Sequence, residues 1–301
     1  MMNRVYNLIK KIFVTIYAIP RIFNLHVLPG HFYSPIPSLD EARKAEKKIW
    51  PENMPKVLPG IDLNVDEQVA LFNEFVPFYR DLPFKSFKSN ELRFYFENPA
   101  YQYSDAIFLY CMMRKLRPKN IIEIGSGFSS CAIMDTNEVF LGNETKVTFI
   151  EPFPSLLISL MKDSDKKQYR ILPKRLEDCE LSEFAILQEN DILFIDSTHV
   201  AKVNSDVNQL FFNILPLLNK GVYIHFHDIF YPFEYPKELI YGGCAWNEGY
   251  ILRAFLQYNN SFKIVFFNTF LEHFFKEMFE AEMPLCLKNP GGSIWIKKCG
   301  T

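Results

Sequence analysis

The sequence predicts an α/β fold in which helices cover both faces of a mostly parallel sheet. Three observations lead to this prediction. After Pro118 the chain carries short, nearly continuous apolar runs, turn residues bound these runs, and the intervals between them are long enough for a helix. Strands of a parallel sheet have this pattern because helices bury them on both faces.

Five runs mark the predicted strands in the order of the chain. They are 121–124, 147–151, a weaker one at 169–172, 191–196 and 221–228. Apolar residues at helical spacing over 207–218, after an Asp206 suited to a first turn, predict a helix between the fourth and fifth strands.

The C-terminal third predicts a helix over 247–258 and two further strands, 262–270 and 293–298. These two strands follow one another without a convincing short crossover. We therefore expect seven strands, one of them antiparallel near the C-terminus.

The first hundred residues have a different texture. Residues 28–60 are rich in proline, with one short helix expected at 40–49 after the cap-like Ser38. Helical spacing of apolar residues predicts helices over 65–80 and 104–115. We interpret 1–100 as a helical and proline-rich arm and 101–301 as the sheet domain. Two interpretations stay open for the arm residues His31, Tyr33 and Ser34, which form either a lid over the ligand site or part of the structural scaffold.

Composition limits the classes of partner. The chain has 301 residues, 49% of them hydrophobic, which is enough for one large domain with or without an appendage. Its 33 Lys and Arg against 35 Asp and Glu give a charge of −2, and no local basic patch is evident, so we expect no nucleic-acid partner. Thirty Phe and 15 Tyr leave apolar surface for a homodimer.

The cysteines predict a cytoplasmic protein. None stands in a Cys-x-x-Cys pair and several lie in apolar runs, as reduced core residues do. No uncharged apolar run approaches the roughly eighteen residues of a spanning helix. Residues 4–21 interleave basic and apolar side chains, and two interpretations stay open. The segment forms either an amphipathic helix packed on its own domain or a peripheral contact with anionic lipid at the inner face of the membrane.

A glycine turn follows the first strand, in the segment IIEIGSGFSS. Gly125 and Gly127 allow a sharp turn that brings backbone amides close to a ligand, and a helix should begin at Ser129 or Ser130. Twenty-four residues after Gly127, the next strand ends at Glu151, where a carboxylate can accept both hydroxyls of a ribose. The two features together predict a nucleoside-containing cofactor.

The details disfavour a dinucleotide. Ser130 stands where a dinucleotide site needs its third glycine, and no strong basic group is nearby for phosphate. Glu123, two residues before the first glycine, suits a cation better than a diphosphate.

The order E-I-G-S-G-F-S-S, F-I-E-P, D-I-L-F-I-D-S-T-H and V-Y-I-H-F-H-D-I resembles a class I S-adenosylmethionine-dependent methyltransferase, with its Rossmann-like fold. The arm L-P-G-H-F-Y-S-P-I-P with H-D-I-F-Y-P-F-E-Y-P and W-N-E-G-Y is similar to bacterial proteins grouped with small-molecule O-methyltransferases. One departure is Ser129, in place of the usual third glycine of E/D-x-G-x-G-x-G.

The resemblance implies that S-adenosylmethionine is the cofactor. Its methionine portion would lie on Gly125, Ser126 and Gly127, and its ribose on Glu151. Glu123 would stand near the sulfonium and amino group or just behind them. Asp196 would also face the cofactor. Asp105, ahead of the first strand, either caps its helix or closes over the cofactor.

Ionisable side chains gather at the carboxyl ends of two adjacent strands, where ligands bind in open parallel sheets. Asp196 and His199 follow one strand, and His225, His227 and Asp228 end the next. Alternation along the strand places His225 and His227 on one face and Asp228 on the other, so His227 and Asp228 can share a site only if the strand ends at His227. His225 is also compatible with a buried, hydrogen-bonded core histidine.

Two mechanisms stay open for activating an acceptor hydroxyl. Metal-dependent O-methyltransferases carry one acid at the position that matches Asp196, and a vicinal acid-acid or acid-amide pair at the positions that match His227 and Asp228. The histidine puts a Mg²⁺ site in doubt but allows Mn²⁺, Fe²⁺ or Zn²⁺. The other mechanism is metal-free general-base catalysis by His227 or His199.

The predicted function is methylation of a small hydroxylated metabolite or sugar, most simply at oxygen, because IDSTHV lacks the Asn/Asp-Pro-Pro-aromatic motif of many N-methyltransferases. Glu234, Tyr235, Trp246 and Asn247 fall in the loop that usually selects the acceptor in this fold. The alternative is a catalytically inactive cofactor-binding or membrane-surface scaffold.

Overall fold

The computed structural model describes residues 25–300. The predictions for residues 4–21 lie outside this part of the chain. Within this part of the chain two compact units are present, the smaller containing residues 25–54 with 236–245 and the larger residues 55–235 with 246–300. Within residues 25–300, no helix combines the length and the apolar character needed to cross a membrane.

The smaller unit contains the short helices α2 (Leu39–Lys44), α3 (Glu46–Ile49) and α11 (Lys237–Tyr241). Ser38 caps α2, since its hydroxyl accepts a hydrogen bond from the amide of Glu41, 3.3 Å away. The prediction of a short helix here is therefore confirmed, although it is divided at Ala45.

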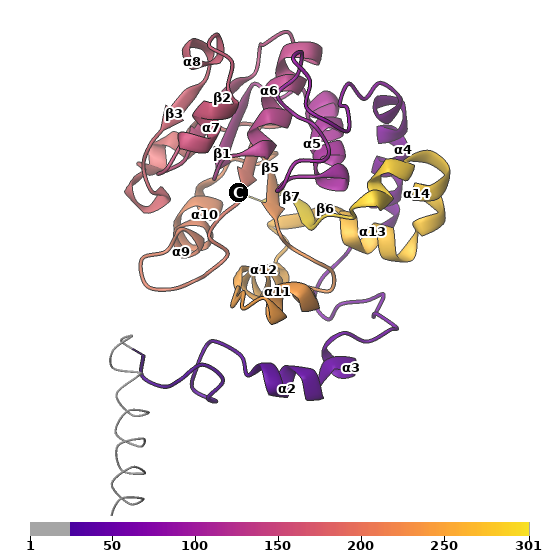
Figure 1. The fold of residues 1–301 in the computed structure, drawn as a ribbon, viewed down its shortest axis with the longest axis vertical. Coiled ribbons are helices and arrows are strands. Elements are labelled where there is room, and N and C mark those ends of the chain that lie inside the picture. Colours follow the sequence, from indigo (N-terminus) through magenta and orange to yellow (C-terminus); the bar gives the residue numbers. More distant parts are fainter. Residues whose placement is uncertain (1–24, 301) are drawn as a thin grey trace, which may run out of the picture. The chain divides into compact units, whose positions relative to one another are not determined.

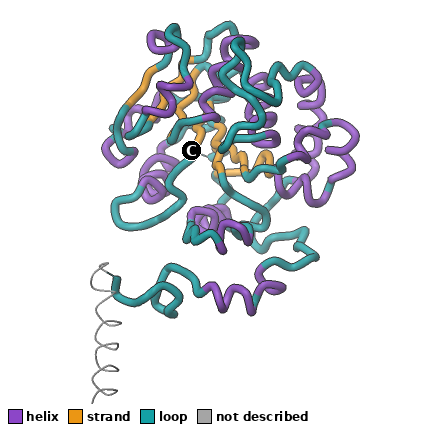
Figure 2. The backbone as a smooth tube through the Cα atoms, viewed as in Figure 1, coloured by secondary structure: helices purple, strands orange, loops and turns teal. Residues whose placement is uncertain are grey.

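The larger unit carries the sheet and most helices (Figure 1). Its strands are β1 (Asn120–Ile124), β2 (Lys146–Ile150), β3 (Arg170–Leu172), β4 (Ile192–Ile195), β5 (Tyr223–His227), β6 (Phe262–Phe267) and β7 (Ser293–Lys298). Its α-helices are α4 (Val65–Arg80), α5 (Tyr103–Leu116), α6 (Phe128–Phe140), α7 (Ser155–Leu160), α8 (Asp165–Gln168), α9 (Asp206–Gln209), α10 (Leu215–Leu217), α12 (Glu248–Leu256), α13 (Asn268–Phe274) and α14 (Lys276–Glu282). Short 3₁₀ turns span Leu176–Asp178, Leu181–Ile186 and Pro284–Lys288, and loops join the elements (Figure 2).

The seven strands form one sheet in the order β3-β2-β1-β4-β5-β7-β6. Strands β1 to β5 pair in parallel, and β7 runs antiparallel to both of its neighbours, β5 and β6. The predicted fold class, with one antiparallel strand near the C-terminus, is confirmed.

Two further predicted elements, both in the larger unit, differ from the structure. The strand expected over 262–270 ends at Phe267, and Asn268 begins α13. The apolar run continues through Phe270 because α13 is also buried, so hydrophobicity alone does not mark the change of element. The helix expected over 207–218 is interrupted by a π turn at Leu210–Ile214, between α9 and α10.

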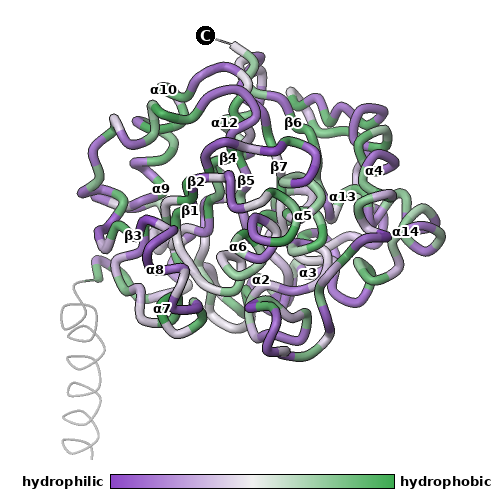
Figure 3. The backbone as a smooth tube through the Cα atoms, turned by 90° about the horizontal axis from the view of Figure 1, so that it is seen from above, coloured by the Kyte–Doolittle hydropathy of each residue, from purple (hydrophilic) through white to green (hydrophobic). Residues whose placement is uncertain are grey.

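Helices cover both faces of the sheet. Phe226 of β5 packs on Phe211 of the π turn, with ring centroids 5.6 Å apart. His225, the preceding residue, stacks on Phe194 of β4, which contacts Tyr101 just before α5. Because successive residues of a strand point to opposite faces, these contacts belong to two layers. Helix α5 is mostly apolar and is buried throughout residues 103–113 (Figure 3).

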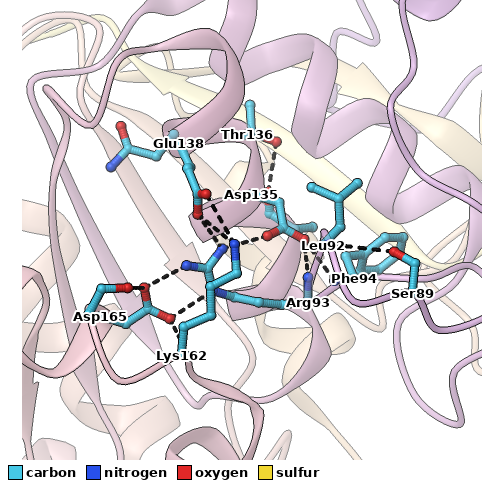
Figure 4. Close-up of polar contacts among 12 residues, drawn as sticks. Ser89, Leu92, Arg93, Phe94, Asp135, Thr136, Glu138, Lys162 and Asp165 are labelled. Carbon is cyan, nitrogen blue, oxygen red and sulfur yellow. Dashed lines mark hydrogen bonds and ion pairs between the residues drawn. The ribbon is translucent and has the colours of Figure 1, made fainter.

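A buried ionic cluster fixes the chain between α4 and α5 against the sheet domain (Figure 4). The guanidinium of Arg93 donates to Asp135 of α6 at 2.6 Å and to both oxygens of Asp165 of α8 at 2.5 and 2.7 Å. Asp135 also accepts the backbone amides of Arg93 and Phe94. Glu138 adds a third carboxylate at 2.8 Å. The two buried acids are thus compensated by one buried cation.

Candidate active site

The glycine turn after β1 brings two strands into close backbone contact. Gly125 has a φ of +80°, and a Cβ at this position would overlap the carbonyl oxygen of Asp196 after β4. Only glycine satisfies both conditions. Helix α6 then begins at Phe128, and the amide of Gly127 donates to the hydroxyl of Ser130 at 3.1 Å.

Glu123 lies beneath this turn. It is fully buried, and its two carboxylate oxygens accept hydrogen bonds from the hydroxyls of Ser129 and Ser130, both at 2.6 Å. Burial raises the pKa of Glu123 to about 8, although the two serine hydroxyls act in the opposite direction. The departure from the glycine pattern at Ser129 therefore supplies a partner for this carboxyl group.

Glu151 follows β2 and lines a cavity of about 400 Å³. One carboxylate oxygen accepts the amide of Phe153 at 2.7 Å, and the other lies 3.5 Å from the hydroxyl of Ser126. The second oxygen thus keeps capacity for a ligand hydroxyl. Gly125 and Asp196 line the same cavity.

Two further segments that we did not predict from the sequence also line this cavity. Residues 175–177 after β3 line it, and so do residues 202 and 204–206 after β4. Asp206 fixes the second segment, because its carboxylate accepts the amide and the hydroxyl of Thr198, both at 2.7 Å. No motif marks these segments, and only their position after parallel strands could have indicated them.

Three predicted site residues meet at the ends of β4 and β5. Asp196, His227 and Asp228 each offer one ligand atom, and these atoms all lie within 4.8 Å of one another. Strand β5 ends at His227, and Asp228 has a φ of +55°, which turns its side chain back to the site. We predicted that His227 and Asp228 can share a site only if the strand ends at His227, and the structure meets this condition. The N/O donor set fits a divalent transition metal ion better than Mg²⁺.

His199 joins Asp196, His227 and Asp228, and together they form a cluster of ionisable side chains at the ends of β4 and β5. Its Nε2 lies 3.5 Å from an oxygen of Asp196 and 3.5 Å from an oxygen of Asp228, and its Nδ1 lies 2.9 Å from Glu248. Glu248 is a member that sequence reasoning did not identify. Its position in W-N-E-G-Y, at the start of the predicted helix over 247–258, was the only available signal.

The charges of this cluster act on one another. Burial disfavours the charged form of His199, but the contacts with Asp196 and Glu248 outweigh it and raise its pKa to about 10. Burial likewise opposes charge on His227, whereas Asp228, Asp196 and Asp105 raise its pKa. Partial burial opposes the charge of Asp196, but both imidazoles face this carboxylate and lower its pKa.

Asp105 and His225 lie behind the cluster. Asp105, in the first turn of α5, accepts Asn268 at 2.8 Å and the amide of Gly292 at 3.1 Å, and it stands 3.9 Å from Nδ1 of His227. His225 is fully buried, as expected of a core histidine, but neither ring nitrogen has a hydrogen-bond partner among the described residues. Burial holds the pKa of His225 well below its usual value.

The four loop residues expected near the acceptor take different places. The ring of Trp246 lies 4.4 Å from that of His199, and Asn247 accepts the amide of Ala201 at 2.6 Å. Glu234 accepts the hydroxyl of Tyr250 at 2.5 Å, and the hydroxyl of Tyr235 accepts the amide of Gly249 at 2.8 Å. Trp246 is therefore the one of the four in ring contact with a member of the cluster.

Comparisons with known proteins give a family match over the segment from β1 to the end of β5. Residues 122–229 match the model of a family described as a methyltransferase domain. An uncharacterized protein of Archaeoglobus fulgidus is 34% identical over 171 residues, which cover 54% of this chain and 75% of that one.

Similar solved structures are more distant. The O-methyltransferase TomG of Streptomyces achromogenes, in complex with S-adenosylmethionine, is 14% identical with a TM-score of 0.42 and covers 77% of this chain and 90% of its own. A Podospora anserina methyltransferase bound to S-adenosylhomocysteine is 15% identical with a TM-score of 0.41, covering 88% and 98%.

Proposed function

We propose that the chain, whose residues 122–229 match a methyltransferase domain, is a class I S-adenosylmethionine-dependent methyltransferase. In this proposal it methylates a hydroxyl group of a small metabolite or sugar with the help of a divalent metal ion. One observation carries the proposal. The cavity beside Glu151 is lined by Asp196, which also belongs to the triad of converging ligand atoms with His227 and Asp228. Cofactor and acceptor would therefore meet at Asp196.

The chain's own residues supply the cofactor site. In the proposal, the turn at Gly125, Ser126 and Gly127 holds the methionine portion of the cofactor, and Glu151 accepts the ribose hydroxyls. Glu123 supports the turn through its two serine contacts. The acceptor hydroxyl would lie in line with the sulfonium methyl group, beside the triad.

Asp196, His227 and Asp228 would hold the metal ion, with Mn²⁺, Fe²⁺ or Zn²⁺ suited to the donor set. A bound ion would lower the pKa of the acceptor hydroxyl. Asp105 faces the other ring nitrogen of His227 and would orient this ligand. Metal-free catalysis with His227 or His199 as the base is the competing mechanism, and a role of residues 1–100 as a lid stays a prediction.

Calorimetry tests the cofactor and metal parts separately. The metal-stripped protein is titrated with S-adenosylhomocysteine and then with Mn²⁺, Zn²⁺ and Mg²⁺. We expect micromolar cofactor binding, tighter binding of Mn²⁺ or Zn²⁺ than of Mg²⁺, and loss of metal binding in His227→Ala and Asp228→Asn. Asp163→Asn, which removes a fully exposed carboxylate, is the matched control.

The reaction is then tested with labelled S-adenosylmethionine against a panel of sugars, phenols and aliphatic alcohols. Label on an acceptor oxygen that disappears on chelation and returns with Mn²⁺ supports the proposal. Label that persists after chelation favours the general-base mechanism. Failure to bind S-adenosylhomocysteine under every condition contradicts the proposal as a whole.

A further inference from the structure

We propose that Glu248 is a positioning residue, which fixes the ring of His199 between Asp196 and Asp228 and so sets the separation of these two acids. The consequence for metal binding rests on the proposed function, whereas the role of Glu248 in fixing the imidazole ring of His199 is independent of it.

Glu248 is fully buried at the start of α12, and both of its oxygens are engaged. One accepts the hydroxyl of Ser197 at 2.9 Å, and the other lies 2.9 Å from Nδ1 of His199. A buried carboxylate is costly unless its partners are close and well oriented. Here both partners belong to the loop after β4, so the carboxylate joins α12 to that loop.

The backbone of His199 is held as tightly as its ring. Its φ is +60°, a conformation that is unfavourable for a non-glycine residue and persists where the surroundings impose it. The amide of His199 donates to the hydroxyl of Ser197 at 2.9 Å, and its carbonyl accepts the amides of Asn247 and Glu248 at 2.9 and 3.1 Å. Trp246 lies against the ring. Strained backbone held by several contacts is typical of functional positions.

These contacts also fix the position of Nε2, the ring nitrogen of His199 that points away from Glu248. Nε2 is 3.5 Å from Asp196, which follows β4, and 3.5 Å from Asp228, which follows β5. One ring therefore spaces the acids from two neighbouring strands, while His227 faces them from β5. Groups that contact the ligands of a metal ion, as His199 contacts Asp196 and Asp228, affect metal affinity by roughly 10- to 100-fold when they are removed.

The direct test is NMR of the histidine side chains in the metal-free protein. The chain has six histidines, so the ¹⁵N and ¹³C ring resonances of His199 can be assigned with His199→Gln. We expect Glu248→Leu to shift the Nδ1 and Nε2 resonances of His199, because the ring loses its carboxylate partner. Glu248→Gln keeps an acceptor oxygen of the same size and should restore much of the ring orientation.

Metal and cofactor titrations give the second measurement. Glu248→Leu should weaken Mn²⁺ binding at least tenfold, Glu248→Gln should weaken it less, and both should keep the affinity for S-adenosylhomocysteine within about twofold. The matched control is Asp191→Asn, which removes another buried carboxylate at the opposite end of β4. This control should lower the melting temperature without altering the His199 resonances or Mn²⁺ binding.

The outcomes separate the two proposals. Unchanged His199 resonances in a folded Glu248→Leu variant overturn the positioning role, whatever the protein binds. Unchanged Mn²⁺ affinity in that variant overturns the consequence for the metal site. A wild-type protein that binds neither S-adenosylhomocysteine nor metal contradicts the proposed function, yet the NMR comparison still decides the role of Glu248.

Discussion

Gly125 lies directly against the backbone carbonyl of Asp196, so that the ends of β1 and β4 meet at the cavity beside Glu151. A side chain at Gly125 would push Asp196 away from the cavity and from His227 and Asp228. Gly142 offers a matched comparison, because its φ is also positive, at +63°, but a Cβ there would meet no atom within 4 Å.

We expect Gly142→Ala to lower the free energy of unfolding by about 1 kcal/mol, the cost of a left-handed alanine. Gly125→Ala should cost about 3 kcal/mol or more, because overlap adds to the same strain. It should also abolish binding of S-adenosylhomocysteine. Denaturant unfolding and calorimetry measure both effects, and equal losses in the two variants would show that the overlap relaxes freely.

Glu123 predicts a specific dependence of stability on pH. Its raised pKa, about 8, means that the folded protein binds a proton more tightly than the unfolded chain. This contribution is complete below the ordinary glutamate pKa near 4.5, falls as the pH rises, and is lost above about 8. Glu123→Gln, which stays neutral, should lose stability less steeply than the wild type between pH 5 and pH 8, a window taken from these two pKa values. Parallel curves from denaturant unfolding at each pH would contradict the assignment.

The Arg93 cluster should be the most sensitive ionic site of the larger unit. Arg93→Leu leaves Asp135 and Asp165 buried without their cation, which typically costs 3–5 kcal/mol. Arg170→Leu breaks an exposed pair with Glu183 and should cost less than about 1 kcal/mol. Chemical denaturation of the two variants checks this difference. Similar small losses would mean that water reaches the two aspartates.

Glu151 should determine cofactor affinity without a large effect on folding. Hydrogen bonds from ribose hydroxyls to a charged carboxylate are each worth about 1.5–3 kcal/mol. Glu151→Ala should therefore weaken S-adenosylhomocysteine binding at least tenfold in calorimetry. Glu144→Ala, on an exposed loop, should leave the affinity unchanged. An unaffected Glu151 variant would remove this residue from the cofactor site.

The sequence by itself determined the order of the strands along the chain, the glycine turn after β1 and the position of Glu151 after β2. Near-continuous apolar runs identified β1 to β5, because strands covered on both faces have no polar side. The glycine turn and Glu151 were likewise readable, since each stands at a fixed offset from a strand. The end of β6 was not readable, because α13 continues the same apolar run.

Only the tertiary structure decided which ionisable groups meet. His199 and Glu248 are 49 residues apart, and Arg93 is 72 residues from Asp165, so no local period links either pair. The turn at Asp228 depends on a backbone angle that the residue type does not dictate. Buried charges are stable only beside their partners, and the folded chain alone brings these partners within hydrogen-bond distance.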